Sequence, residues 1–163
     1  MNLKNLQLLN FSEEHVRYEI SMFYETGHKI VEKSDLFAMN ILTESFAIHT
    51  RNLIYFFYPE HAKPDDVTSE HFFENPKTEW LPIRPVLSKT LINARDRANK
   101  EIAHLTLKRI AGIDPKKGWH RNDVMNEMHK ILLLFVGRAS DRLLHPNVIN
   151  LVRDHSKRFV TDS

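Results

Sequence analysis

The stretch that decides the fold is SDLFAMNILTESFAIHTRNLIYFFYP, which covers residues 34–59. Ser34 and Asp35 are residue types that cap helix N-termini, and Pro59 cannot continue a helix, so the stretch carries a start and a stop signal. Between these signals, the side chains at the spacing of one helix face are Ala38, Leu42, Phe46, His49, Leu53 and Phe56. The sequence therefore predicts a long amphipathic helix that buries this stripe.

Three further segments show the same spacing of apolar residues. The first covers residues 12–33, with Ser12 as its cap and two acidic residues that suit the first helical turn. The next covers residues 85–111 and begins with a proline in its first turn. The last of the three begins at Asn122 or Asp123, either of which can cap a helix.

A long connection, residues 59–84, separates the second and third predicted helices and is rich in proline and acidic residues. A loop of this length is either functional or packed down, and Phe72, Phe73 and Trp80 favour packing, with a short helical turn after Ser69. A short last helix is expected at 146–157. Because no convincing strand pair is present, we predict one all-α domain over residues 1–163: a four-helix bundle with a short extra C-terminal helix and a long packed loop between helices 2 and 3.

Composition excludes several classes of function. The chain has no cysteine, which excludes disulfides, thiolate zinc sites and cysteine nucleophiles. The longest apolar run, Ile131 to Val136, is too short to span a bilayer, and the N-terminus lacks the features of a signal peptide, so we expect a cytoplasmic protein without membrane association. No glycine-rich phosphate loop and no His-Glu-x-x-His motif is present, and we expect neither a metal nor another cofactor.

The stretch RDRANKEIAHLT, residues 95–106, carries the most reactive set of side chains. At about 100° per residue, Arg97, Glu101 and His104 fall on one flank of the core face, and Asn93 lies close to them. A histidine can act as general acid or base on a 2′-hydroxyl or on the leaving oxygen, and a guanidinium can bind the scissile phosphate, so this chemistry needs no metal. The alternative is a helix-flank ion pair between Arg97 and Glu101, with His104 hydrogen-bonded to a neighbour.

Three side chains of the second helix bear on this site. His49 lies in the centre of the apolar stripe, and a polar group there needs a partner. It is either a satisfied core histidine, or it faces Glu101 or His104 across the bundle and orients them. Asn52 lies on the flank of the stripe and can join such a polar seam, whereas Arg51 points nearly opposite and is expected in solvent or at an interface.

Two Glu-x-x-His pairs, Glu25 with His28 and Glu101 with His104, raise the alternative of a di-metal bundle. That class of site needs both pairs to project into the bundle core. At helical spacing, however, Glu25 and His28 point away from the core face of the first helix. The sequence therefore argues against a metal site.

Basic residues cluster around and after this stretch. The cluster suits a single-stranded nucleic-acid backbone with one aromatic platform for stacking a base, and its members expected to bind RNA are Lys100, Lys108, Lys116, Lys117, Trp119 and Arg121. The alternative is a solvated helix face followed by a loop that a tryptophan anchors.

An arginine and a histidine separated by four to six residues on a late helix of a four-helix bundle resemble the motif of the HEPN superfamily (higher eukaryotes and prokaryotes nucleotide-binding). Here the motif is Arg97 and His104, and the stretches FAIHTRNLIYFFYP and ANKEIAHLT are similar to uncharacterised bacterial HEPN-like proteins over roughly residues 35–125. The family often has a polar residue directly after the arginine, where this chain has Ala98.

The resemblance implies a metal-independent endoribonuclease in a toxin–antitoxin or phage-defence setting, with a possible cognate antitoxin as partner. It implies that Arg97 and His104 are catalytic and that two motif helices meet across a homodimer, which the small residues Ala94 and Ala98 would allow to approach closely. The family also contains inactive members, so the alternative is a non-catalytic HEPN-like dimerisation or nucleic-acid and nucleotide-binding module.

Overall fold

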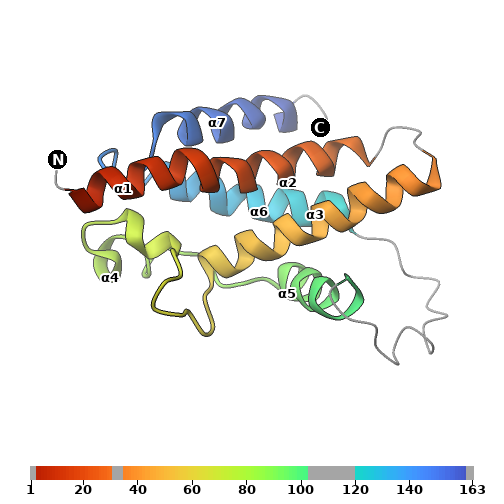
Figure 1. Ribbon diagram of the computed structural model, residues 1–163, viewed down its shortest axis with the longest axis horizontal. Coiled ribbons are helices and arrows are strands. Elements are labelled where there is room, and N and C mark those ends of the chain that lie inside the picture. Colours follow the sequence, from red (N-terminus) through yellow and green to blue (C-terminus); the bar gives the residue numbers. More distant parts are fainter. Residues whose placement is uncertain (1–2, 31–34, 103–119, 161–163) are drawn as a thin grey trace.

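The structure of the protein is a computed structural model that describes residues 3–30, 35–102 and 120–160 (Figure 1). Within these ranges every element is helical and none is a strand. The prediction of an all-α protein is therefore confirmed for the part of the chain that the structure describes.

The N-terminal helix begins earlier than predicted. Helix α1 (Leu3–Phe11), the π-helical turn η1 (Ser12–Val16) and α2 (Arg17–Lys29) follow one another without a break (Figure 1). The prediction that Ser12 caps a helix is wrong, because its hydroxyl donates to the Leu9 carbonyl oxygen at 2.7 Å and accepts from the His145 backbone N–H at 2.9 Å. Ser12 is fully buried and connects this helical run to the start of the C-terminal helix.

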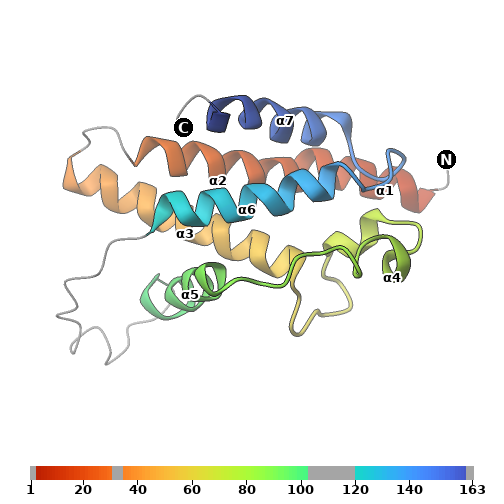
Figure 2. The same cartoon turned by 180° about the vertical axis from the view of Figure 1, so that it is seen from behind.

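Helix α3 (Leu36–Phe57) is the helix that residues 34–59 predict. Asp35 caps it as expected, since its carboxylate accepts from the Ala38 backbone N–H at 2.9 Å. The helix ends two residues before Pro59. It runs antiparallel to α2, and the two pack along each other (Figures 1 and 2).

The long connection after α3 is packed down, as predicted. It contains the short helix η2 (Ser69–Phe72), which is the turn expected after Ser69, and α4 (Pro76–Glu79). Phe72, Phe73 and Trp80 are buried, and the Trp80 indole N–H donates to the Ser69 hydroxyl at 2.9 Å. Phe73 and Trp80 stack with ring centroids 5.2 Å apart, so this loop is part of the core.

Helix α5 (Lys89–Arg97) begins later than Pro85, because the Ser88 hydroxyl caps it by accepting from the Leu91 backbone N–H at 3.2 Å. It continues into the π-helical turn η3 (Ala98–Ile102), and the rest of this predicted helix lies outside the described residues. Helix α6 (Arg121–Val136) has His120 at its N-cap position without a side-chain cap, so the predicted caps Asn122 and Asp123 fall inside its first turn. Helix α7 (Pro146–Val160) is the predicted last helix.

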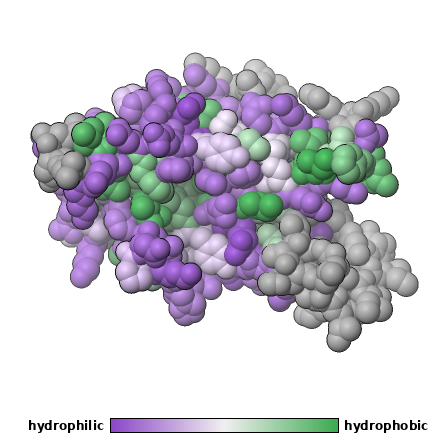
Figure 3. Space-filling model, viewed as in Figure 1, coloured by the Kyte–Doolittle hydropathy of each residue, from purple (hydrophilic) through white to green (hydrophobic). Residues whose placement is uncertain are grey.

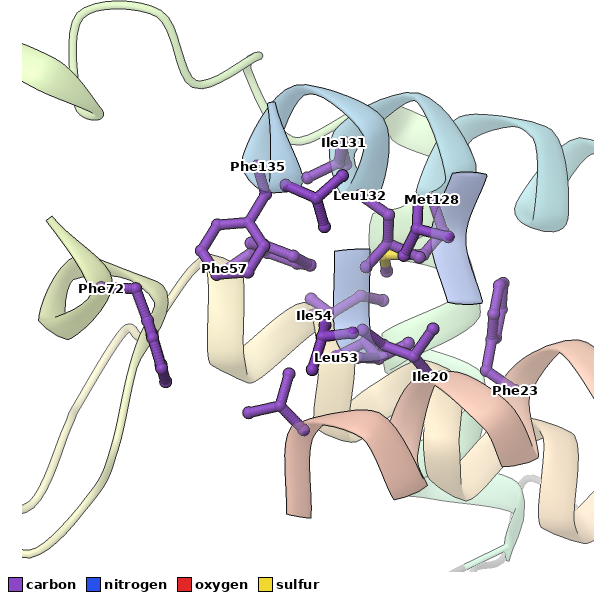
Figure 4. Close-up of a cluster of buried hydrophobic side chains, with 14 of the residues drawn as sticks. Ile20, Phe23, Leu53, Ile54, Phe57, Phe72, Met128, Ile131, Leu132 and Phe135 are labelled. Atoms are coloured by element: carbon purple, nitrogen blue, oxygen red, sulfur yellow. The ribbon is translucent and has the colours of Figure 1, made fainter. Parts of the chain in front are cut away.

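The core lies between α2, α3 and α6 (Figure 4). Burying one large apolar side chain stabilises a protein by about 1.5 to 3 kcal/mol, and those that Figure 4 labels here are Ile20, Phe23, Leu53, Ile54, Phe57, Phe72, Met128, Ile131, Leu132 and Phe135. Helix α7 packs on α2 and α6, whereas α5 packs on α3 and α6. The two therefore lie at opposite edges of the molecule, with the core between them (Figures 1 and 2).

Candidate functional site

Only part of the predicted ribonuclease site falls in the described ranges. Arg97 is the last residue of α5 and is half-buried, Asn93 is exposed on the same helix, and Lys100 is exposed on η3. The remaining residues predicted to act on RNA from this region lie outside the described residues: His104, Lys108, Lys116, Lys117, Trp119 and the side chain of Glu101. The structure therefore describes the position of Arg97, whereas His104 lies outside the described residues.

The turn directly after Arg97 is not α-helical. Residues Ala98–Ile102 form a π-helical turn, in which hydrogen bonds join residues five apart rather than four. The placing of Arg97, Glu101 and His104 on one stripe assumed about 100° per residue, which does not hold through this turn. Isolated π turns inside helices are found frequently at functional sites, but η1 is a second such turn among the described residues, so the turn alone does not single out this region.

Ala94 and Ala98 are buried within the chain itself, each 3% exposed. They were expected to let a second copy approach α5 closely. Because α5 and η3 pack on α3 of the same chain, these alanines serve that internal contact. The physical reason that the sequence offered for a dimer at this stripe therefore does not hold.

A polar cluster joins η3 to α3, and we call Arg51, Tyr55 and Asn99 the Arg51 cluster. The Asn99 side-chain amide donates to the Tyr55 hydroxyl at 3.2 Å. The Arg51 guanidinium lies over the Tyr55 ring, 5.3 Å from its centroid, which is cation–π distance. All three side chains are half-buried, so Arg51 is neither fully solvated nor in the core.

A second arginine on this edge, Arg95, is fully engaged with carboxylates. Its guanidinium donates to Glu60, and Nε and Nη2 each donate to Asp96 Oδ1 at 3.2 Å. The Arg51 Nε atom, by contrast, is shielded from solvent and has no hydrogen-bond partner among the described residues.

His49 and Asn52 are brought together by a residue that the sequence did not single out, Glu19 of α2. The buried His49 donates from Nδ1 to Glu19 Oε2 at 2.8 Å, and the Asn52 amide donates to the same oxygen at 3.2 Å. His49 thus has the partner that a buried polar group requires. The stripe on α3 revealed that a partner was needed, but nothing in the spacing of α2 pointed to Glu19.

Another polar set, which sequence reasoning missed, joins α2, α6 and α7. We call Tyr24, His129, His155 and Ser156 the histidine seam. The Tyr24 hydroxyl lies 2.6 Å from His129 Nδ1, and His129 Nε2 lies 3.2 Å from the Ser156 hydroxyl oxygen. The Tyr24 and His155 rings stack with centroids 4.1 Å apart and an interplanar angle of 11°.

The contacts of Ser156 indicate which groups donate and which accept in the histidine seam. The Ser156 hydroxyl donates its single proton to the Val152 carbonyl oxygen at 3.3 Å. On this basis we assign the proton of His129 to Nε2, which donates to Ser156, and we assign Nδ1 as the acceptor of the Tyr24 hydroxyl. Burial, and secondly the neighbouring His155, lowers the pKa of His129 to about 4, which keeps the imidazole neutral. Burial also raises the pKa of Tyr24, which keeps its proton on the phenol.

Helix α7 covers His28 of α2, whereas the Glu25 side chain stays 47% exposed. The His28 ring stacks on the His155 ring with centroids 5.9 Å apart, and Glu25 forms an ion pair with Lys29 at 3.5 Å. The sequence placed His28 away from the core of the four main helices and did not foresee that α7 covers this side chain. Within the described ranges, no group of three histidine, aspartate or glutamate side chains is arranged to hold a metal ion.

Arg121, expected to contact RNA, connects the start of α6 to the end of α2. Its Nη1 donates to the Gly27 carbonyl oxygen at 2.9 Å, and its Nη2 donates to Asn122 Oδ1 at 2.7 Å. Burial lowers the pKa of Arg121. These contacts occupy several of its donors inside the fold.

No family model matches the chain, and no curated protein or solved structure is significantly similar to it. Among the described residues, no helix is both long enough and apolar enough to cross a membrane.

Proposed function

We propose that this protein is a metal-independent endoribonuclease of HEPN type, in which Arg97 binds the scissile phosphate and His104 is the general acid or base. The observation that supports the proposal is the position of Arg97. It is a half-buried arginine at the end of α5, directly before a π-helical turn, where helices often carry function. The mutual contacts of α2, α3, α5 and α6, with α7 packed outside, also suit the four-helix bundle with an extra helix that this family requires.

The proposed reaction is cleavage of an RNA strand by its own 2′-hydroxyl. The 2′-oxygen loses its proton to a general base and attacks the adjacent phosphorus, the bond from phosphorus to the 5′-oxygen breaks, and the leaving oxygen takes up a proton. The products are a 2′,3′-cyclic phosphate and a free 5′-hydroxyl. Arg97 supplies the charge that stabilises the phosphate as negative charge builds up on it.

The test is cleavage of single-stranded RNA in the presence of EDTA. We expect the wild type to cut, and His104→Ala and Arg97→Ala to be folded and to lose at least about a hundredfold in rate, which is the usual contribution of a general acid or base. His15→Ala and Arg153→Ala are the matched controls, because both residues are exposed and lie on η1 and α7 rather than beside α5. Equal cleavage by the wild type and His104→Ala, or no cleavage by the wild type, would remove the catalytic claim.

A non-catalytic dimerisation or nucleic-acid-binding module is the second candidate, and the surface of α3 favours it. The N-terminal half of this helix exposes Leu36 and Phe37, each 75% exposed, and Ile41 at 51%. Figure 3 shows apolar surface at this end of the molecule. Exposed apolar surface of this kind is typical of contacts with another protein, which would be a second copy or a cognate antitoxin. Sedimentation of the wild type and of Phe37→Ser at micromolar concentration tests the dimer.

A further inference from the structure

Arg51 differs from three other half-buried arginines, Arg84, Arg95 and Arg121. Arg95 is engaged by two carboxylates, Arg84 donates to the Phe57 carbonyl oxygen at 2.5 Å, and Arg121 donates to Gly27. Arg51 forms no ion pair with a described residue, and its shielded Nε has no acceptor. A guanidinium cannot give up its charge, and leaving a buried donor without an acceptor costs about 1 to 3 kcal/mol. The Arg51 guanidinium therefore contacts the Tyr55 ring but is engaged by no described carboxylate or carbonyl oxygen.

Tyr55 adds a second donor that the fold does not use. Its hydroxyl oxygen accepts from the Asn99 amide at 3.2 Å, so its own proton remains available to an acceptor outside this pair. Asn99 uses one of its two amide protons in that bond, which leaves the other. The cation–π contact with the Tyr55 ring holds the Arg51 guanidinium beside these groups.

The two carboxylates and two cations beside the Arg51 cluster balance one another, so the attraction for an anion comes from Arg51 itself. Glu60 and Asp96, the carboxylates on the same edge, both accept hydrogen bonds from Arg95. Lys100, next to Asn99 in the chain, is exposed and adds positive charge. Each of the three side chains is partly exposed, so a ligand can reach the cluster at atoms other than the shielded Arg51 Nε, and partial shielding from water strengthens the attraction between opposite charges.

We propose that the Arg51 cluster binds a phosphate group in the seam between α3 and η3. Donors from three side chains on two elements suit a tetrahedral phosphate, whose oxygens point in several directions, better than a planar carboxylate. The phosphate can come from a mononucleotide or from the backbone of an RNA strand. The second source rests on the proposed function, because it makes the cluster a subsite that holds the strand at a nucleotide other than the one that is cut.

The experiment is binding of a fluorescent 2′-O-methyl RNA strand, which the proposed reaction cannot cleave, measured by anisotropy. Arg51→Met keeps much of the apolar stem and removes the charge, and Tyr55→Phe removes only the hydroxyl. We expect each variant to keep the wild-type helical circular dichroism spectrum and to bind at least about tenfold more weakly, as expected for loss of a hydrogen bond to a charged group. Arg153→Met and Tyr18→Phe are the controls, because both residues are exposed and lie on other helices, and they should bind as the wild type does.

Calorimetry with adenosine 5′-monophosphate separates the two sources. If the nucleotide also binds, and Arg51→Met weakens it equally, a free phosphate group suffices; if only the strand binds, the site takes a backbone phosphate. Wild-type affinity of Arg51→Met and Tyr55→Phe for both probes, or binding of neither probe by the wild type, would overturn the phosphate site. The ribonuclease proposal fails separately: a wild type that binds the strand through Arg51 but does not cut unmodified RNA keeps the phosphate site and loses the catalytic role of His104.

Discussion

The polar side chains at the two edges of the molecule differ in how deeply they are buried and in how they are hydrogen-bonded. At the α7 edge, one hydrogen bond connects Tyr24 to His129 and another connects His129 to Ser156. His129 is only 6% exposed. At the α5 edge, the Arg51 cluster is half-buried and keeps donors that no described side chain uses. A buried chain of hydrogen bonds such as Tyr24–His129–Ser156 stabilises one arrangement of helices. The Arg51 guanidinium, in contrast, forms no ion pair with a described residue, and its shielded Nε without an acceptor costs stability. We infer that the α7 edge serves the fold and the α5 edge serves function.

The largest effect on stability is expected from His129→Ala. The change removes a buried ring and leaves the Tyr24 hydroxyl without its acceptor, so the free energy of unfolding should fall by about 3 kcal/mol or more. Urea denaturation measures it, with His61→Ala, an exposed loop histidine, as the control that should change it by less than about 0.5 kcal/mol. Equal effects of the two substitutions would show that the histidine seam does not stabilise the fold.

The histidine seam should also make stability depend on pH. The pKa of His129 is about 4 in the folded chain, against 6.5 as its ordinary value. Between these values the unfolded chain binds a proton that the folded chain does not, so the contribution is complete above about pH 6.5 and is lost as the pH falls towards 4. We expect the free energy of unfolding to fall by about 1 to 3 kcal/mol over this window. In His129→Gln, the free energy of unfolding should fall by about 1 to 3 kcal/mol less over the same pH window. If its dependence on pH is the same in the variant as in the wild type, other groups cause it.

Glu19→Gln tests the hydrogen bonds from His49 and Asn52 of α3 to Glu19 of α2. The neutral amide accepts more weakly from His49 and Asn52, so we expect a loss of about 1 kcal/mol in the free energy of unfolding. RNA binding should not change, because the Glu19–His49 contact joins α2 to α3 and is separate from the Arg51 cluster. If the variant has wild-type stability but altered RNA binding, the role of His49 is in the functional site rather than in stabilising the fold.

The smallest effect on stability is expected from Arg51→Met. Replacing a half-buried cation that forms no ion pair with a described residue by an apolar side chain removes the cost of its unsatisfied Nε donor, at the loss of a weak cation–π contact. The free energy of unfolding should therefore stay within about 0.5 kcal/mol of the wild-type value or rise slightly. A loss of 2 kcal/mol or more in thermal or urea denaturation would show that Arg51 has a structural partner.

The helices were predictable where local signals and the core pattern agree. Asp35 caps α3 and the chain leaves the helix before Pro59, as residues 34–59 indicate. Ser12 followed by acidic residues has the same local pattern as a cap, but its hydroxyl is used by Leu9 and by His145. That second partner is 133 residues away in the chain, and a local pattern contains no information about such a contact.

The candidate site was predictable only in part, for a similar reason. The central position of His49 in an apolar stripe revealed that it needs a partner, but the partner depends on how α2 packs on α3. The π-helical turn after Arg97 leaves no periodic pattern in five residues. Arg51 was expected in solvent or at an interface, because a helical wheel gives the direction of a side chain and not what packs beside it. Tyr24 and His129 were missed because the sequence did not show that α7 would cover them.

The most direct measurement is the same substitution made at both edges, tyrosine to phenylalanine at Tyr24 and at Tyr55, with unfolding and RNA binding measured on both variants. Each change removes one hydroxyl and keeps the ring. We predict that Tyr24→Phe lowers the free energy of unfolding by about 1 to 3 kcal/mol and binds RNA as the wild type does. We predict that Tyr55→Phe leaves stability within about 0.5 kcal/mol and weakens RNA binding. If Tyr55→Phe instead destabilises the protein as much as Tyr24→Phe and binds RNA normally, the α5 edge is a structural contact, and the division between the two edges is wrong.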